Sequence, residues 1–175
     1  MSSVIKVNEI QNISGTTALS IDSSGQPTFA KAKVPSFHVY IANGQTVAHG
    51  TPTDILFDSN HFLYGWTLDT STGILTASAD AAGVYQLHAT SRANTSTDNN
   101  TSMKILLSGS SDSNGIGSQY CYSEYYQGMD INVLYEISAG DTLRMRVSQS
   151  TGSGVVFGAF DAGYVTRFHG FRVSK

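Results

Sequence analysis

A strict alternation of apolar and polar residues recurs along most of this 175-residue chain and limits its fold more than any other feature. The pattern is clearest in "SFHVYIA" (36–42), "MDINVLYEI" (129–137), "DTLRMRV" (141–147) and "GYVTRFHGFRV" (163–173). A period of two is typical of a strand that buries one face. In the last segment the alternation shifts near Gly170, where we expect a bulge or bend.

Turn residues separate these runs at short and regular intervals. In "DTSTGILTASADAAGVYQLHA" (69–89), Asp69 and Gly73 bracket one expected turn, and Asp80 and Gly83 bracket the next. Many short strands at this spacing are typical of a β-sandwich or barrel. Roughly ten strands and no amphipathic helix are expected, so the predicted fold class is all-β.

Composition narrows the functional classes. Hydrophobic residues make up 40% of the chain, enough for a core, whereas charged residues make up only 13%, about half the usual fraction of a soluble domain. Such a low charge indicates either a surface rich in hydroxyl and amide groups or burial in an oligomer. The net charge of −3 argues against nucleic-acid binding.

The single cysteine and the apolar segments of the chain give predictions about disulfides and about membrane insertion. Cys121 cannot form an intrachain disulfide, and its strand-like setting predicts a buried structural thiol rather than a nucleophile. No signal peptide and no membrane-spanning run are visible. We therefore expect no membrane insertion and synthesis in a reducing cytoplasm.

The first 35 residues differ from the rest and are predicted to form an arm and linker. They contain two short apolar alternations, and Pro27 and Pro35 read as linker residues. The segment is too short to bury its own apolar positions, so we expect it to pack against its own domain, a second copy or a larger assembly. The anchoring residues of this arm are predicted to be Val4, Ile5, Val7, Ile10, Leu19 and Ile21.

Residues 36–175 resemble the complement-type globular head, the jelly roll that is shared with the tumour-necrosis-factor family. "SFHVYIA" resembles its first strand and "DILFDSN" (54–60) its second, while "EISAGDTLRMRV" and "FHGFRV" resemble its later and closing strands. Asp69, Gly73, Gly83 and Tyr85 match the central pattern of the family. The resemblance implies an antiparallel jelly-roll β-sandwich that assembles as a homotrimer.

The N-terminal segment "IKVNEIQNISGTTALSIDSSGQPTF" (5–29) resembles the leader of virion structural proteins from marine cyanobacterial phages. That resemblance implies a component of a phage particle that is made in the bacterial cytoplasm and displayed on the virion surface. Its partners would be its own copies and other virion proteins, such as capsid or tail proteins. A capsid-decorating protein is the first expectation, because the chain is short and has no fibre shaft.

No residue pattern predicts an enzyme, a cofactor or a metal site. The five histidines lack metal-ligand spacing, although equivalent histidines of a trimer could meet near its axis. The aspartates mostly lie at turn edges, so a hydrolase-like carboxylate pair is not favoured.

A receptor-binding tip of a short tail fibre is the alternative function, with a rim that contacts host surface glycan. Aromatic side chains can stack on sugar faces. For the aromatic residues of this chain, which include Trp66, Tyr64 and Phe62, we nevertheless favour packing in the core or in a subunit interface. The glycan or receptor contacts of this alternative are Tyr120, Tyr122, Tyr125 and Tyr126.

Overall fold

The computed structural model describes residues 9–11, 17–29, 34–94, 99–109, 111–123, 127–158 and 166–175. Its regular structure consists of antiparallel β-strands and two short 3₁₀ helices, which confirms the all-β class. The chain divides into two compact units, residues 1–33 and 34–175. The division falls close to the predicted boundary between residues 35 and 36.

The first unit contains a small three-stranded antiparallel sheet in the order β1–β2–β3. Its strands are β1 (Glu9–Gln11), β2 (Thr17–Ile21) and β3 (Pro27–Phe29). The Asp22 carboxylate accepts hydrogen bonds from the backbone N–H groups of Ser24 and Gln26, which closes the turn between β2 and β3. Pro27 therefore begins a strand, where a missing N–H is tolerated, and is not the linker residue that the sequence predicted.

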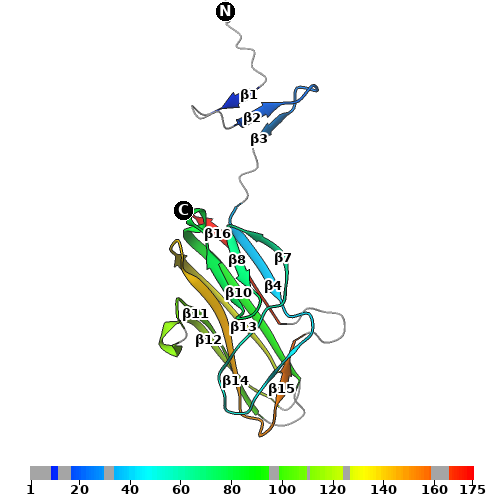
Figure 1. Cartoon of the computed structure of the whole chain (residues 1–175), viewed down its shortest axis with the longest axis vertical. Coiled ribbons are helices and arrows are strands. Elements are labelled where there is room, and N and C mark those ends of the chain that lie inside the picture. Colours follow the sequence, from blue (N-terminus) through cyan, green and yellow to red (C-terminus); the bar gives the residue numbers. More distant parts are fainter. Residues whose placement is uncertain are drawn as a thin grey trace, which may run out of the picture. The chain divides into compact units, whose positions relative to one another are not determined.

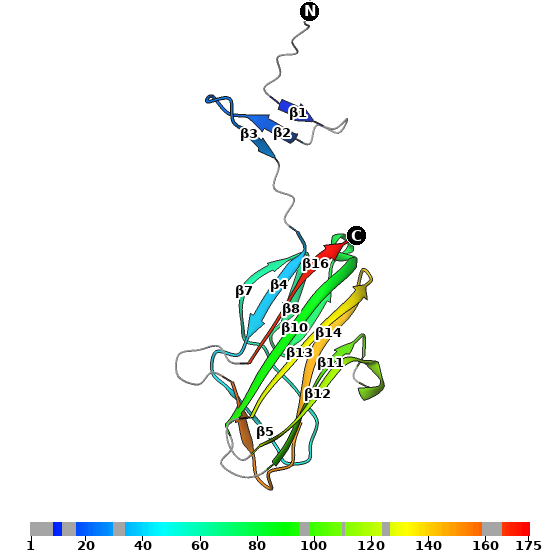
Figure 2. The ribbon, with the colours of Figure 1, turned by 180° about the vertical axis from the view of Figure 1, so that it is seen from behind.

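The second unit is an antiparallel β-sandwich of the jelly-roll kind, built from two sheets (Figures 1 and 2). The first sheet runs β5–β15–β10–β16–β4–β7, and β13 pairs with the other edge of β10. Its strands are β4 (Ser36–Tyr40), β5 (Gln45–Val47), β7 (Ser59–Tyr64), β10 (Gly83–Asn94), β13 (Gln127–Ile137), β15 (Val155–Phe157) and β16 (Arg167–Ser174).

The second sheet runs β12–β11–β14–β9–β8, and β6 also pairs with β14. Its strands are β6 (Thr53–Asp54), β8 (Trp66–Asp69), β9 (Ile74–Ala77), β11 (Asn99–Leu107), β12 (Gly115–Ser123) and β14 (Thr142–Gln149). The 3₁₀ helices are η1 (Ala79–Ala81) and η2 (Asp112–Asn114). "DILFDSN" is thus not a single strand, because only its ends pair; Ile55 and Phe57 are nevertheless buried.

The core lies between the two sheets and is filled by the inward residues of each alternating strand. Phe37 contacts Phe168 and Trp66 edge to face, with ring centroids 4.9 Å apart in both pairs. The Trp66 indole N–H donates to the Tyr85 hydroxyl at 3.2 Å, and this hydroxyl donates to the Ala81 carbonyl at 2.7 Å. These bonds satisfy the polar atoms of two buried aromatic side chains, and burial raises the pKa of Tyr85.

A glycine is required at position 170 because neighbouring core side chains leave no room for a Cβ atom, and not because the strand bulges there. Its register with Leu87 is regular, and the irregularity in β16 comes later, where Val84 pairs with Ser174 and Tyr85 with Arg172. A Cβ atom at Gly170 would lie 2.7 Å from Leu87 Cδ2 and 2.8 Å from Phe37 Cε1. The irregularity expected near Gly170 therefore lies two to four residues further on, at Arg172–Ser174.

The Asp69–Gly73 turn follows its prediction. The Gly73 N–H donates to the Asp69 carbonyl at 2.8 Å, and Gly73 has a φ of +70°. A Cβ atom there would meet the Ile55 carbonyl oxygen at 1.9 Å, so no side chain fits. The Asp80–Gly83 segment overlaps the 3₁₀ helix η1.

Cys121 does not match the expectation of a buried thiol. It is only partly buried, because it lies on β12, an edge strand of the second sheet, and packs against the margin of the core. Its thiol is free.

Candidate functional site

Three of the five histidines of the chain lie in one row on the outer face of the first sheet. His38 of β4, His169 of β16 and His88 of β10 are direct register partners on neighbouring strands (the strands appear side by side in Figure 2). Strand alternation turns all three outward, because Phe37, Phe168 and Leu87 beside them point into the core. Cross-strand pairing thus gathers residues that lie up to 131 positions apart, from 38 to 169.

The histidine row (His38, His169 and His88) is continued at both ends. His88 Nδ1 lies 3.2 Å from His169 Nε2, and His88 Nε2 lies 2.6 Å from a carboxylate oxygen of Asp130 on β13. At the other end, the rings of His38 and His61 are 4.7 Å apart, and those of His38 and His169 are 5.4 Å apart.

The surroundings of His169 and His38 favour neutral imidazoles. Burial, followed by the nearby His88, His38 and Arg167, lowers the pKa of His169 from 6.5 to about 4. Burial, with His61 and Arg167 as weaker causes, also lowers the pKa of His38. His38 Nε2 and His169 Nδ1 are buried and have no hydrogen-bond partner among the described residues, so a charge on either ring would be poorly solvated.

Apolar side chains flank the histidine row on the same outer face. Phe62 and Tyr64 of β7 stack with ring centroids 5.6 Å apart. Phe171 of β16 is 49% exposed, and Leu134 of β13 is 59% exposed. Together these four residues, the histidine row and the hydrogen-bonded amides of Gln86 and Asn132 form what we call the histidine face.

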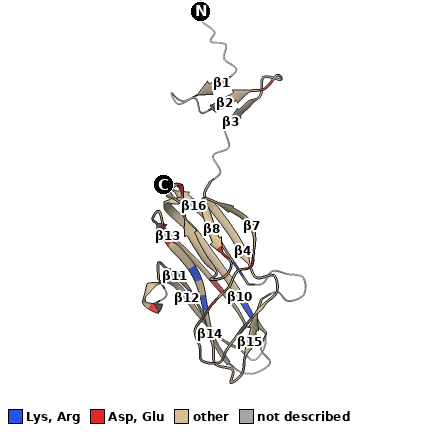
Figure 3. Cartoon of the chain, in the orientation of Figure 1, with Lys and Arg blue, Asp and Glu red and all other residues tan. Residues whose placement is uncertain are grey.

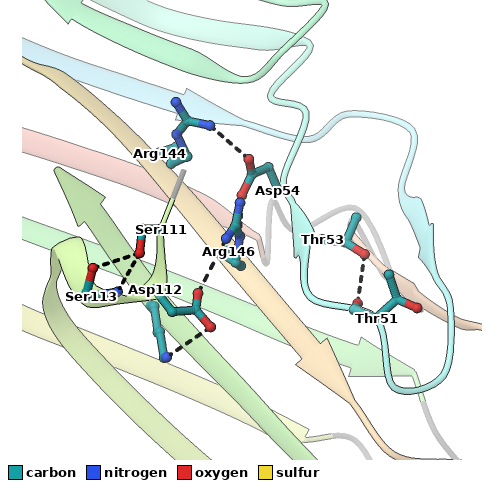
Figure 4. Close-up of polar contacts among 9 residues, drawn as sticks. Thr51, Thr53, Asp54, Ser111, Asp112, Ser113, Arg144 and Arg146 are labelled. Atoms are coloured by element: carbon teal, nitrogen blue, oxygen red, sulfur yellow. Dashed lines mark hydrogen bonds and ion pairs between the residues drawn. The ribbon is translucent and has the colours of Figure 1, made fainter. Parts of the chain in front are cut away.

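The second sheet carries a contrasting, charged outer face (Figure 4). Asp54 accepts from Arg144 Nη1 at 3.1 Å and from Arg146 Nε at 2.7 Å. Asp112 of η2 lies 3.4 Å from both Lys104 Nζ and Arg146 Nη1. The hydrogen bond to Asp54 is the main cause that raises the pKa of Arg146.

A shallow hollow lies beside this charged network. Its volume is about 210 Å³, and its lining includes Tyr120, Ser102, Ser148 and Pro52 together with Lys104, Asp112 and Arg146. Tyr120 is 71% exposed, the most exposed of the large apolar or aromatic side chains that the structure describes. The hollow is therefore a place on this face where a small ligand could contact an aromatic ring and charged groups together.

The sequence-predicted residues are distributed as follows. Tyr120 lies at the hollow; Tyr122 is in β12, but its side chain, and the whole of Tyr125 and Tyr126, lie outside the described residues. Among the arm positions, Ile10 and Ile21 are 48% and 38% exposed and Leu19 is partly buried. Val4, Ile5 and Val7 lie outside the described residues.

The aromatics near Trp66 divide between core and surface. Trp66 is buried, as expected for core filling, whereas Phe62 and Tyr64 are exposed on the histidine face. Sequence reasoning placed His38, His88 and His169 in strands but could not join them into a row. It also missed the contacts of Asp54, because its arginine partners lie 90 and 92 residues away.

The carboxylates mostly support turns. Asp69 accepts hydrogen bonds from Ser71, and these bonds lower the pKa of Asp69. Asp58 accepts from the Ala42 N–H at 2.8 Å, and Asp141 from the Ser138 N–H at 2.8 Å. Within the described ranges, no group of three or more His, Cys, Asp or Glu residues has the geometry to hold a metal ion.

Comparison of the chain with protein-family models finds no match, and a search of the curated proteins finds no significant relative. Among the described residues there is no helix with the length and hydrophobicity needed to cross a bilayer.

Proposed function

We propose that this protein is a non-enzymatic structural protein of a bacteriophage particle, a homotrimer that decorates the capsid surface. The jelly-roll unit would form the projecting head, and the N-terminal unit would attach to other virion proteins. The proposal starts from the two resemblances of the sequence, to the complement-type head and to the cyanophage leader.

The observation that supports it best is the histidine face. Phe171, Leu134, Phe62 and Tyr64 leave apolar surface exposed on one sheet, next to Asp130 and Arg167, which also lie beside the histidine row. Interfaces between copies are depleted of charged residues and enriched in aromatic side chains at their centre. Covering this face with a second and third copy would remove that apolar surface from water.

The division of the chain into two units supports an anchoring role for the first one. Its sheet is too small to enclose a core of its own, and the exposed Ile10 and Ile21 are available for contact. The outer edges of β1 and β3, which pair with no other described strand, could add to a strand of a neighbouring virion protein.

The oligomer is tested by sedimentation of the full chain. We expect the mass of three chains, and a shift to single chains in the variant Phe171→Lys/Leu134→Lys, because a charge on each side chain would disrupt a buried interface. Tyr120→Lys, which places a lysine at an exposed aromatic position on the opposite sheet, is the control and should sediment as wild type. A monomeric wild-type chain at micromolar concentration would contradict the trimer.

The anchoring role is tested by removing residues 2–33. The shortened protein should retain its cooperative unfolding and its oligomeric mass but should no longer join particles that lack the native protein. Normal decoration of particles by the shortened protein would show that the head itself carries the attachment site.

A further inference from the structure

The hollow on the second sheet has the architecture of a small saccharide site. We propose that it binds an acidic sugar, a hexuronic acid residue, with the ring against Tyr120 and the carboxylate toward Lys104 and Arg146. The inference stands on this face alone and does not depend on the virion role or on the trimer.

The hollow exists because two small residues meet on adjacent strands. Ser102 of β11 pairs with Tyr120 of β12 on one side and with Ser148 of β14 on the other. These three residues therefore form one outward row, in which two short side chains lie next to a large aromatic one. Pro52, which also lines the hollow, precedes β6, and β6 pairs with the edge of β14 that faces away from β11.

Tyr120, which forms the aromatic side of the hollow, is unusually exposed. Tyr120 is 71% exposed, although it lies in the middle of a nine-residue strand and not in a loop. An exposed tyrosine ring offers an apolar face for the C–H groups of a pyranose and a hydroxyl for a polar contact. The serine hydroxyls of the floor can donate to or accept from the hydroxyls of a sugar.

The charged end of the hollow favours an anionic ligand. Lys104, Arg144 and Arg146 carry three positive charges, whereas Asp54 and Asp112 carry two negative ones. Among these five described residues there is an excess of one positive charge, on a chain whose net charge is −3; Figure 3 marks the charged residues along the chain. A ligand carboxylate would complete the charge balance of the network.

The geometry of Asp112 leaves room for such a ligand. Its contacts to Lys104 and Arg146 are both 3.4 Å, which is long for a charge-assisted hydrogen bond. Its side chain is 47% exposed. Asp54, in contrast, accepts from Arg146 Nε at 2.7 Å and so holds the guanidinium in place (Figure 4); Arg146 also lines the hollow.

A second hollow extends the site along β12. It has a volume of about 360 Å³ and shares Lys104, Asp112 and Tyr120 with the first one, and Ser118 also lines it. Because the two hollows share the Tyr120 and Lys104 side chains, together they suit consecutive sugar rings better than one isolated ring. The ligand class is therefore an acidic oligosaccharide, of which the free monosaccharide is the minimal probe.

The test uses saturation-transfer NMR and amide chemical-shift titration of the full chain with four probes. D-Glucuronic and D-galacturonic acid carry ring and carboxylate, D-glucose carries the ring alone, and acetate carries the carboxylate alone. We expect at least one hexuronic acid to bind, more than fivefold tighter than D-glucose and than acetate, with shifts at Ser102, Lys104 and Ser148.

Three variants separate this site from general surface binding. Tyr120→Ala should weaken hexuronic acid binding at least tenfold and leave the melting temperature unchanged, because the side chain is largely exposed. Ser148→Trp should fill the floor and abolish binding. Tyr64→Ala, on the opposite sheet, is the matched control and should bind as wild type.

Several results would overturn the proposal. One is that neither hexuronic acid binds at 50 mM. Another is that D-glucose or acetate binds as tightly as the acids, and a third is that Tyr120→Ala binds normally. None of these outcomes bears on particle attachment or on sedimentation mass, so a failure here is distinguishable from a failure of the virion role.

Discussion

Acidification should lower the free energy of unfolding through the histidine row, and we expect His169 to contribute to this loss. Its pKa in the folded chain is about 4, below the ordinary value of 6.5. As the pH falls, the unfolded chain therefore takes up the proton first. The stabilising contribution of neutral His169 is complete above about pH 6.5, declines between pH 6.5 and 4, and is lost below that window.

The size of the effect follows from the same values. A shift from 6.5 to about 4 corresponds to at most about 3 kcal/mol of unfolding free energy at 1.36 kcal/mol per unit. His169 is only partly buried, and solvent screening reduces this limit to about 1–2 kcal/mol. The His88, His38 and Arg167 charges that face it act in the same direction, whereas Asp130 opposes them.

The assay is urea unfolding of the full chain at a fixed concentration, at pH 7 and at pH 4, for wild type and His169→Gln. Glutamine stays neutral throughout, so the variant should lose about 1–2 kcal/mol less than wild type on acidification. His49→Gln, which changes an exposed histidine outside the row, should follow wild type. NMR titration of the histidine ring protons would give the pKa directly.

Two results would refute the reasoning. If the His169 ring titrates at or above 6.5, the assignment of a neutral imidazole to His169 is wrong. If His169→Gln retains the whole pH dependence of wild type, the lost stability belongs to other groups.

Packing and charge give two further predictions, both measured by urea unfolding at pH 7. Gly170→Ala should lower the unfolding free energy by about 1–3 kcal/mol, because its Cβ would overlap Leu87 and Phe37; Gly128→Ala, which meets nothing within 4 Å, should change it by less than about 0.5 kcal/mol. Asp54→Asn should cost about 1–2 kcal/mol by leaving the guanidiniums of two arginines without their carboxylate, whereas Asp112→Asn, 47% exposed with contacts at 3.4 Å, should cost less than about 1 kcal/mol. A larger loss for Asp112→Asn than for Asp54→Asn would contradict the ranking of the two carboxylates.

Local features of the chain could be predicted without a structure. Alternation of Leu143, Met145 and Val147 with two arginines identifies a half-buried strand, because strand geometry turns every second residue to the same face. The Asp69–Gly73 turn follows from backbone preferences of residues only four positions apart. Such features depend on short-range geometry, so the amino-acid sequence alone determined the all-β class and the position of most strands of the head.

Which strands lie side by side was decided only by the tertiary structure. His38, His88 and His169 each carry the same local signal, an outward position on a strand, and nothing in that signal says that they pair. The sequence also suggested a bend near Gly170. The actual reason for the glycine is that Leu87 and Phe37 exclude a side chain there, and these two residues are distant in sequence. Register across a sheet is set by the packing of the whole core, so the histidine row and the hollow beside Tyr120 emerge only when both sheets are assembled.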